Sequence, residues 1–152
     1  MKLLIVNGPN INMLGIREKH IYGDRDYAAL CRMIEGWAGE LGCEAELYQS
    51  IHEGAFVDRI LQASFDGTDV IVINPAAYTN TSVAILDALK AVQLPAVEVH
   101  ISDVNAREPF RRLSYAGMAC VEHFIGMGFE GYRRAMEYLV ERIGNGELGI
   151  GN

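Results

Sequence analysis

The sequence predicts an α/β protein with a flavodoxin-like, doubly wound sheet of five parallel strands in the order 2-1-3-4-5. Three apolar runs, at 3–6, 70–73 and 96–99, are short, continuous and bounded by turn residues, a pattern typical of strands buried on both faces. Segments with helical periodicity alternate with the strands, which favours right-handed crossovers and a parallel sheet. In this order the first, third and fourth strands are immediate neighbours.

The elements follow one another along a single domain, expected at residues 1–143. Strands are expected at 3–6, 44–49, 69–73, 95–101 and 120–125. Helices are expected at 26–41, 53–64, 81–92 and 130–143, with a short helix at 105–112. The segment 15–24 has neither periodicity and is predicted to be a mobile loop. Residues 144–152 hold four glycines and are predicted to be a flexible tail.

Each longer helix has an apolar stripe that we expect to face the sheet. These stripes are Leu30, Ile34, Ala38 and Leu41 in the first, Phe56, Ile60 and Leu61 in the second, Val83, Leu86 and Leu89 in the third, and Tyr132, Met136, Leu139 and Ile143 in the fourth. Gly42 is expected to end the first helix.

Composition narrows the classes of protein. The 152 residues include 13 Lys and Arg against 20 Asp and Glu, a net charge of −7. No basic block occurs, so nucleic acid is not an expected partner. No apolar stretch reaches the roughly 18 residues that a membrane helix needs. Three cysteines without a C-x-x-C pair indicate reduced thiols and a cytoplasmic location.

Polar clusters follow the first, third and fourth strands, at 7–10, 74–78 and 100–102. The carboxyl ends of neighbouring parallel strands form the crevice where such sheets bind ligands. Glu98 and His100 are two apart on one strand and therefore share a face, which suits a general acid oriented by a carboxylate. The alternative is a strand-end histidine that a carboxylate merely satisfies.

Other candidates come from the loops. Tyr22 lies in the 15–24 segment with Arg17, and a tyrosine base needs nearby cations to lower its pKa. Arg107 or Arg111 could supply a second positive charge. The alternative is that these side chains only decorate the surface.

The strand ends also offer neutral polar groups. Asn10 and Asn74 suit a bound water or a developing oxyanion, unless they only satisfy turn backbone. Ile101 and Ser102 offer backbone N–H groups and a hydroxyl for a carboxylate. His123 alternates within the fifth strand and is expected to be structural. The chain has no Rossmann or Walker A spacing, no zinc motif and no nucleophile elbow.

These clusters resemble the type II 3-dehydroquinate dehydratases over nearly the whole chain. The matching blocks are 7–15, Arg17-Glu18 with Tyr22-Gly23, 49–54, 74–82, 98–102 and 106–111. The resemblance implies conversion of 3-dehydroquinate to 3-dehydroshikimate by anti elimination through an enolate, in the shikimate pathway or in quinate catabolism. It also implies a homo-oligomer, a dodecamer of four trimers, with no metal or organic cofactor.

The resemblance further implies a role for each site residue. Tyr22 would remove the proton beside the ketone, with Arg17 and Arg107 favouring its phenolate. A water near Asn10 and Asn74 would stabilise the enolate, and His100, oriented by Glu98, would protonate the departing hydroxyl. The substrate would be held by Ile101 and Ser102 at its carboxylate, by Arg111 at a ring hydroxyl, and by Asp87 of a neighbouring subunit.

One departure from the family pattern concerns the substrate. Asn80 stands where the family usually has a histidine that binds a substrate hydroxyl, so we expect weaker substrate binding with the chemistry intact. Two alternatives to the enzyme remain. One is a flavodoxin-like binding protein for FMN or a phosphorylated ligand, and the other is a degenerate homologue without dehydratase activity.

Overall fold

The protein is built on a five-stranded sheet. The computed structural model describes residues 1–16, 20 and 25–148. All strand pairs are parallel and the order is β2-β1-β3-β4-β5, which confirms the predicted fold class. The strands are β1 (Lys2–Asn7), β2 (Glu44–Gln49), β3 (Val70–Asn74), β4 (Ala96–His100) and β5 (Glu122–Ile125), each close to its predicted position.

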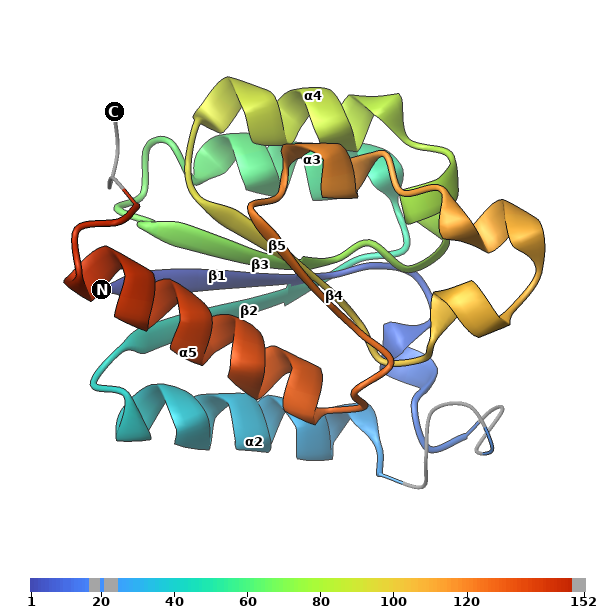
Figure 1. The fold of residues 1–152 in the computed structure, drawn as a ribbon, viewed down its shortest axis with the longest axis horizontal. Coiled ribbons are helices and arrows are strands. Elements are labelled where there is room, and N and C mark those ends of the chain that lie inside the picture. Colours follow the sequence, from blue (N-terminus) through green and yellow to red (C-terminus); the bar gives the residue numbers. More distant parts are fainter. Residues whose placement is uncertain (17–19, 21–24, 149–152) are drawn as a thin grey trace.

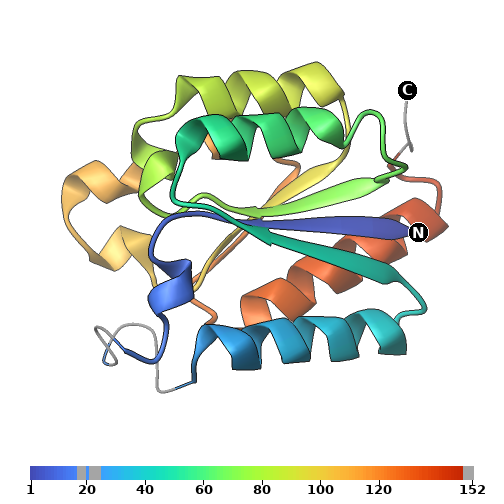
Figure 2. The ribbon, with the colours of Figure 1, turned by 180° about the vertical axis from the view of Figure 1, so that it is seen from behind.

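In the described part of the chain, four helices cover the two faces of the sheet. The helices α2 (Tyr27–Glu40) and α5 (Glu130–Gly144) lie on one face, and α3 (Glu53–Gln62) and α4 (Val83–Val92) lie on the other (Figures 1 and 2). Short connecting segments gather beyond the carboxyl ends of the strands. This is the edge at which the polar clusters were expected to meet.

Local signals set the ends of these helices. The Asp26 carboxylate accepts a hydrogen bond from the Ala29 N–H at 2.8 Å, and the Ser82 hydroxyl accepts one from the Ile85 N–H at 3.0 Å. Each bond satisfies an N–H group that the first helical turn leaves unpaired. Gly42, at φ 68°, follows the end of α2 in the left-handed conformation, as predicted.

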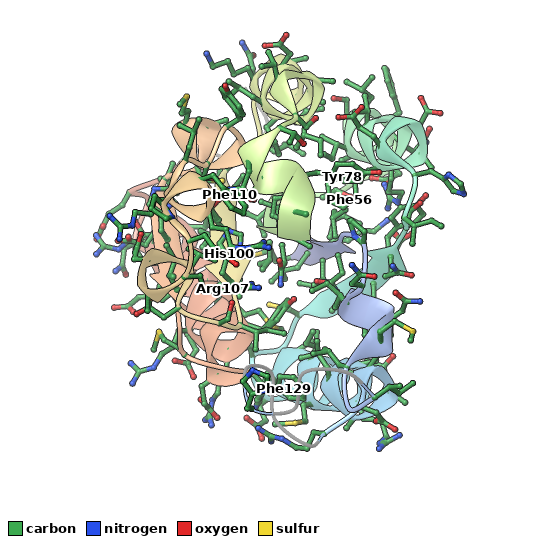
Figure 3. The ribbon with its side chains drawn as sticks, turned by 90° about the vertical axis from the view of Figure 1, so that its right-hand side faces the viewer. Phe56, Tyr78, His100, Arg107, Phe110 and Phe129 are labelled. Atoms are coloured by element: carbon green, nitrogen blue, oxygen red, sulfur yellow. The ribbon has the colours of Figure 1, made fainter. Side chains whose placement is uncertain are left out.

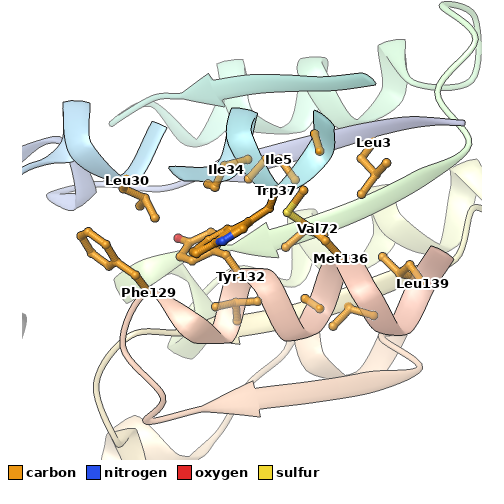
Figure 4. Close-up of a cluster of buried hydrophobic side chains, with 14 of the residues drawn as sticks. Leu3, Ile5, Leu30, Ile34, Trp37, Val72, Phe129, Tyr132, Met136 and Leu139 are labelled. Atoms are coloured by element: carbon orange, nitrogen blue, oxygen red, sulfur yellow. The ribbon is translucent and has the colours of Figure 1, made fainter. Parts of the chain in front are cut away.

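The core has two layers because side chains of the central strands alternate. Leu3 and Ile5 pack on the side of α2 and α5, whereas Leu4 and Val6 pack on the side of α3 and α4. Figure 4 shows the first layer, where the ring of Tyr132 lies beside α2. All of these side chains are fully buried. A strand covered on both faces explains the unbroken apolar run in the sequence.

The prediction that Leu61 and Val83 face the sheet is wrong. Leu61 of α3 is 38% exposed and Val83 of α4 is 48% exposed. At 100° per residue, both side chains point away from the buried face of their own helix. That stripe is Phe56, Ile60 and Ala63 on the side of α3, and Ile85, Leu86, Ala88, Leu89 and Val92 in α4.

The helix predicted at 105–112 is also wrong. The chain forms two separate 3₁₀ turns, η3 (Val104–Ala106) and η4 (Pro109–Arg112). Glu108, between them, has φ −61° and ψ 146°. The ring of a proline disfavours helical backbone in the preceding residue, so Pro109 begins a new turn instead of continuing the old one.

Several sequence expectations concern the periphery of the fold. Cys31, Cys43 and Cys120 are free thiols. Within the described ranges, no helix is long and apolar enough to cross a membrane. Most of the segment predicted as a loop, at 17–19 and 21–24, lies outside the described residues, as do the last four residues of the predicted tail.

Candidate active site

A cavity of about 190 Å³ opens where the carboxyl ends of β1, β3 and β4 meet. Figure 3 shows the molecule from this end, with His100 and Arg107 labelled. The cavity wall contains eight of the predicted site residues: Asn10, Asn74, Asn80, His100, Ile101, Ser102, Arg107 and Arg111. Residues far apart in the sequence thus meet in one place, as the strand order predicted.

The charge of the cavity wall is opposite in sign to that of the chain. Arg107 and Arg111 both line the cavity, and no Asp or Glu belongs to the part of its wall that the structure describes. A guanidinium keeps its positive charge at any physiological pH. The cavity therefore suits an anionic ligand although the protein carries a net charge of −7.

Glu98 and His100 form the predicted pair on β4. The His100 Nε2 lies 3.2 Å from Oε2 of Glu98 and 3.5 Å from the Thr79 hydroxyl. Glu98 is 1% exposed and His100 is 5% exposed. A carboxylate can only accept, so Nε2 carries the proton that lies between them. Within the described chain no hydrogen bond holds the other ring nitrogen, Nδ1, which leaves it available to a ligand.

Two further side chains donate to Glu98, and the sequence did not reveal either contact. The Ser114 hydroxyl donates to Oε2, and His123 Nδ1 lies 2.9 Å from Oε1. His123 reaches Glu98 because β5 pairs with β4 in a register that sets these two residues side by side. Spacing within one strand carries no information about this register.

The donors decide the protonation state of Glu98. Burial alone would raise the pKa of its carboxyl. The hydrogen bonds from His100, Ser114 and His123, together with the charge on His100, outweigh burial and lower that pKa to about 2. Glu98 is therefore a carboxylate at neutral pH, and it stabilises a positive charge on the imidazole beside it.

Asn74 is held from the interior of the protein. Its Nδ2 donates to the Tyr132 hydroxyl at 2.9 Å, and its Oδ1 accepts from the Ala76 N–H at 3.2 Å. The Tyr132 hydroxyl in turn donates to Oδ1 of Asn7 at 2.6 Å. An amide has two N–H donors and two lone pairs, so half of the capacity of Asn74 is free for a ligand in the cavity.

The loops after β1 and β3 pack tightly against each other. The Gly8 N–H donates to the Asn74 carbonyl at 2.8 Å. A Cβ at Gly8 would lie 2.4 Å from the carbonyl oxygen of Pro75. Asn10 at φ 71° and Ala76 at φ 53° both have left-handed backbone, which for a residue other than glycine costs about 1 kcal/mol or more. The cavity wall is thus shaped by backbone that tertiary contacts hold in place.

Ile101 and Ser102 follow β4 at the bottom of the cavity and are both nearly buried. Their backbone N–H groups donate to no other residue in the described part of the chain. The Ile101 carbonyl accepts from the Gly128 N–H at 3.1 Å, which fixes this turn. Two adjacent N–H donors in a fixed turn can bind a carboxylate.

The segment after β4 closes another side of the cavity. The Arg111 Nε lies 2.5 Å from Oε2 of Glu108, and its guanidinium lies 5.0 Å from the centre of the Phe110 ring. The Asn80 Nδ2 donates to the Leu113 carbonyl at 2.8 Å. Asn80 thereby connects the loop after β3 to this segment and lines the cavity as well.

The remaining predicted residues are Arg17, Tyr22 and Asp87. Arg17 and Tyr22 lie outside the described residues. Asp87 is exposed on α4 and is not part of the cavity wall. As for metals, the described ranges hold no group of three or more His, Cys, Asp or Glu side chains suited to a metal ion.

Comparison with known proteins gives consistent matches. A family model described as dehydroquinase class II matches residues 1–140. The chain is 51% identical over 142 residues to a 3-dehydroquinate dehydratase of Lachnospira eligens, covering 93% of this chain and 97% of that protein. A type II dehydroquinase structure from Butyrivibrio crossotus has a TM-score of 0.90 at 51% identity, covering 91% of this chain and 97% of that one. One from Propionibacterium acnes has a TM-score of 0.88 at 38% identity, covering 92% and 96%.

Proposed function

The chain belongs to the class II dehydroquinase family, and from this premise we propose how its own residues carry out the family's hydro-lyase reaction. The protein dehydrates 3-dehydroquinate to 3-dehydroshikimate. The proposed course is an anti elimination: a base removes the proton beside the ketone, an enolate forms, and an acid protonates the hydroxyl that leaves as water.

The observation that carries this proposal is a buried carboxylate–imidazole pair at the end of a cavity lined by arginines. His100 is the proposed acid. Glu98 holds the proton of Nε2 and stabilises the charged ring, so Nδ1 is the nitrogen from which a proton can reach the leaving hydroxyl. General acid catalysis of this kind contributes about 10²–10⁴-fold in rate.

Tyr22 is the proposed base. A phenol ionises near pH 10, so it acts as a base at neutral pH only beside positive charges. Arg107 lies in the cavity wall, and Arg17 precedes Tyr22 by five positions in the sequence. We assign to these two arginines the lowering of the pKa of Tyr22.

The enolate is the next species that needs stabilisation. Asn10 lies in the loop after β1, Asn74 ends the neighbouring strand β3, and both line the cavity. The buried Tyr132 hydroxyl holds the amide of Asn74 in one orientation. A water held by both amides would donate to the enolate oxygen. Such a donor is already oriented when the charge develops, which is the condition for effective stabilisation.

The substrate's other groups match the remaining wall. The unused N–H groups of Ile101 and Ser102, with the Ser102 hydroxyl, suit its carboxylate. Arg111 suits a ring hydroxyl. Asn80 supports substrate binding with a neutral amide that also contacts the Leu113 carbonyl.

The assembly and the cellular context are also proposals. We propose a dodecamer of four trimers in the cytoplasm, with Asp87 of one subunit reaching the substrate of a neighbour. Its exposed position on α4, away from the cavity of its own subunit, fits that role. The reaction would serve the shikimate pathway or the breakdown of quinate.

The test is a spectrophotometric assay for the conjugated enone product on 3-dehydroquinate, with wild type beside Tyr22→Phe and His100→Ala. We expect an active wild type and losses of at least about 10²-fold in kcat for either variant. A wild type that stays inactive at high enzyme concentration would instead support a homologue without dehydratase activity. A yellow protein as purified would support FMN binding. The comparisons favour neither alternative.

A further inference from the structure

Glu98 has three side-chain donors, and they divide unequally between its two oxygens. Oε2 lies 3.2 Å from His100 Nε2 and also accepts from Ser114. Among the described residues, His123 is the one side chain that donates to Oε1, at 2.9 Å. Because Glu98 is 1% exposed, its two oxygens depend on these protein donors instead of water.

The carboxylate has little room around it. A Cβ at Gly117 would lie 2.9 Å from Oε1 of Glu98 and 2.9 Å from the Ser114 hydroxyl. The backbone of Gly117 therefore packs against one side of the group while His123 holds its end. A carboxylate confined in this way presents Oε2 to His100 at one distance and one angle.

From these contacts we propose that His123 is a positioning residue for the acid: by holding Oε1 of Glu98, it fixes the plane of the carboxylate and so the orientation of the His100 ring. This inference rests on the function proposed above. In the described chain, His123 is not part of the active-site cavity wall, and its ring contacts Glu98, so it would act through Glu98.

The ring of His123 faces both the protein and the solvent. Its side chain is 41% exposed, on the edge strand of the sheet. Glu98 and His100 from β4 and Glu122 from its own strand are the titratable groups beside it. Arg111 and Arg112 from η4 lie across a second cavity, which His123 also lines. Of these, Glu98 is the group that its ring nitrogen contacts.

Removing the donor has a definite electrostatic consequence. A carboxylate that loses one donor holds its remaining proton donor more strongly. The charged His100 ring is then stabilised more strongly, so its Nδ1 proton becomes harder to release to a leaving group. We expect a lower kcat with little change in KM, and a basic limb of the kcat profile that moves to higher pH.

The experiment compares two substitutions at one position. His123→Phe keeps a ring of similar shape without a donor, and His123→Asn places an amide N–H near the position of Nδ1. We expect His123→Phe to lower kcat about tenfold with KM changed less than about twofold. We expect His123→Asn to recover most of that loss and the wild-type pH profile. His52→Phe is the matched control, because His52 is exposed at the start of α3, away from the cavity.

The outcomes separate the inference from the function on which it rests. An inactive wild type would contradict the proposed function. An active wild type with His123→Phe at normal kcat and an unchanged pH profile would overturn the positioning role alone. Equal loss in the Phe and Asn variants would overturn it too, since packing and not the donor would then matter. Should His123→Phe not fold, His123→Val gives the same comparison with a side chain favoured in strands.

Discussion

The hydroxyl of Tyr132 connects the carboxyl ends of β1 and β3 through Asn7 and Asn74. Its removal gives a quantitative test of how much these buried hydrogen bonds stabilise the site. Tyr132→Phe keeps the fully buried ring in the core and deletes one oxygen atom. That oxygen donates to Asn7 Oδ1 at 2.6 Å and accepts from Asn74 Nδ2 at 2.9 Å. Asn7 is 0% exposed and Asn74 is 2% exposed, so each would lose a hydrogen-bond partner on its buried side.

The expected loss follows from these two contacts. A buried polar group without a partner costs about 1–3 kcal/mol, so the variant should lose about 2–5 kcal/mol of the free energy of unfolding. For a domain of this size, each kcal/mol shifts the Tm by about 2–4 °C. We therefore expect the Tm to fall by about 5–15 °C. Activity should fall as well, because Asn74 would no longer be held in one orientation.

The measurement is urea unfolding and a thermal scan at one fixed protein concentration, with steady-state kinetics at a temperature where both proteins are folded. Tyr48→Phe is the matched control. Its hydroxyl donates to the Ala55 carbonyl at 3.4 Å near the surface, so we expect a loss below about 1 kcal/mol. If Tyr132→Phe were as stable as Tyr48→Phe, the reasoning from buried unpaired groups would be refuted for this site.

Three other predictions concern Glu98, Gly8 and Asn80. The Glu98 carboxyl has its pKa lowered from 4.5 to about 2, so its contribution of about 3 kcal/mol is complete above about pH 5 and is lost as the pH falls toward 2. Glu98→Gln should lack this part of the pH dependence in urea unfolding at a series of pH values, and an identical slope in both proteins would contradict the assignment. Gly8→Ala should cost about 3 kcal/mol, since its Cβ would meet the Pro75 backbone at 2.4 Å, whereas Gly36→Ala in α2, with open space around it, should gain about 0.5–1 kcal/mol. A stable Gly8→Ala protein would mean that the two loops can separate freely. Asn80→Ala should raise KM about tenfold with kcat within about twofold in steady-state assays, and a loss confined to kcat would place Asn80 in the chemistry instead.

The sequence predicted the sheet well because buried parallel strands have a simple signature. An unbroken apolar run such as 70–73, bounded by turn residues, is typical of a strand covered on both sides, and the polar residue after each run marks the cavity edge. Glu98 and His100 were paired correctly since side chains two apart on a strand share a face.

Features that depend on contacts between strands could not be read in the same way. The contact between His123 and Glu98 follows from the register of β5 against β4, which no pattern within either strand encodes. The division of the 105–112 segment depends on Pro109, whose effect on Glu108 outweighs the helical preference of its neighbours. The roles of Tyr22 and Arg17 remain predictions because both residues lie outside the described chain.

The three donors on Glu98 also constrain the order of assembly during synthesis. A buried carboxylate without partners is strongly unfavourable, and here the partners include Ser114 and His123, which leave the ribosome after β4. Until those residues are present, a nascent chain has to keep the carboxylate hydrated or protonated. Before β5 pairs with it, β4 is the edge strand of the sheet. Docking of β5 is therefore the step that brings the His123 donor to the buried carboxylate and completes its set of hydrogen bonds.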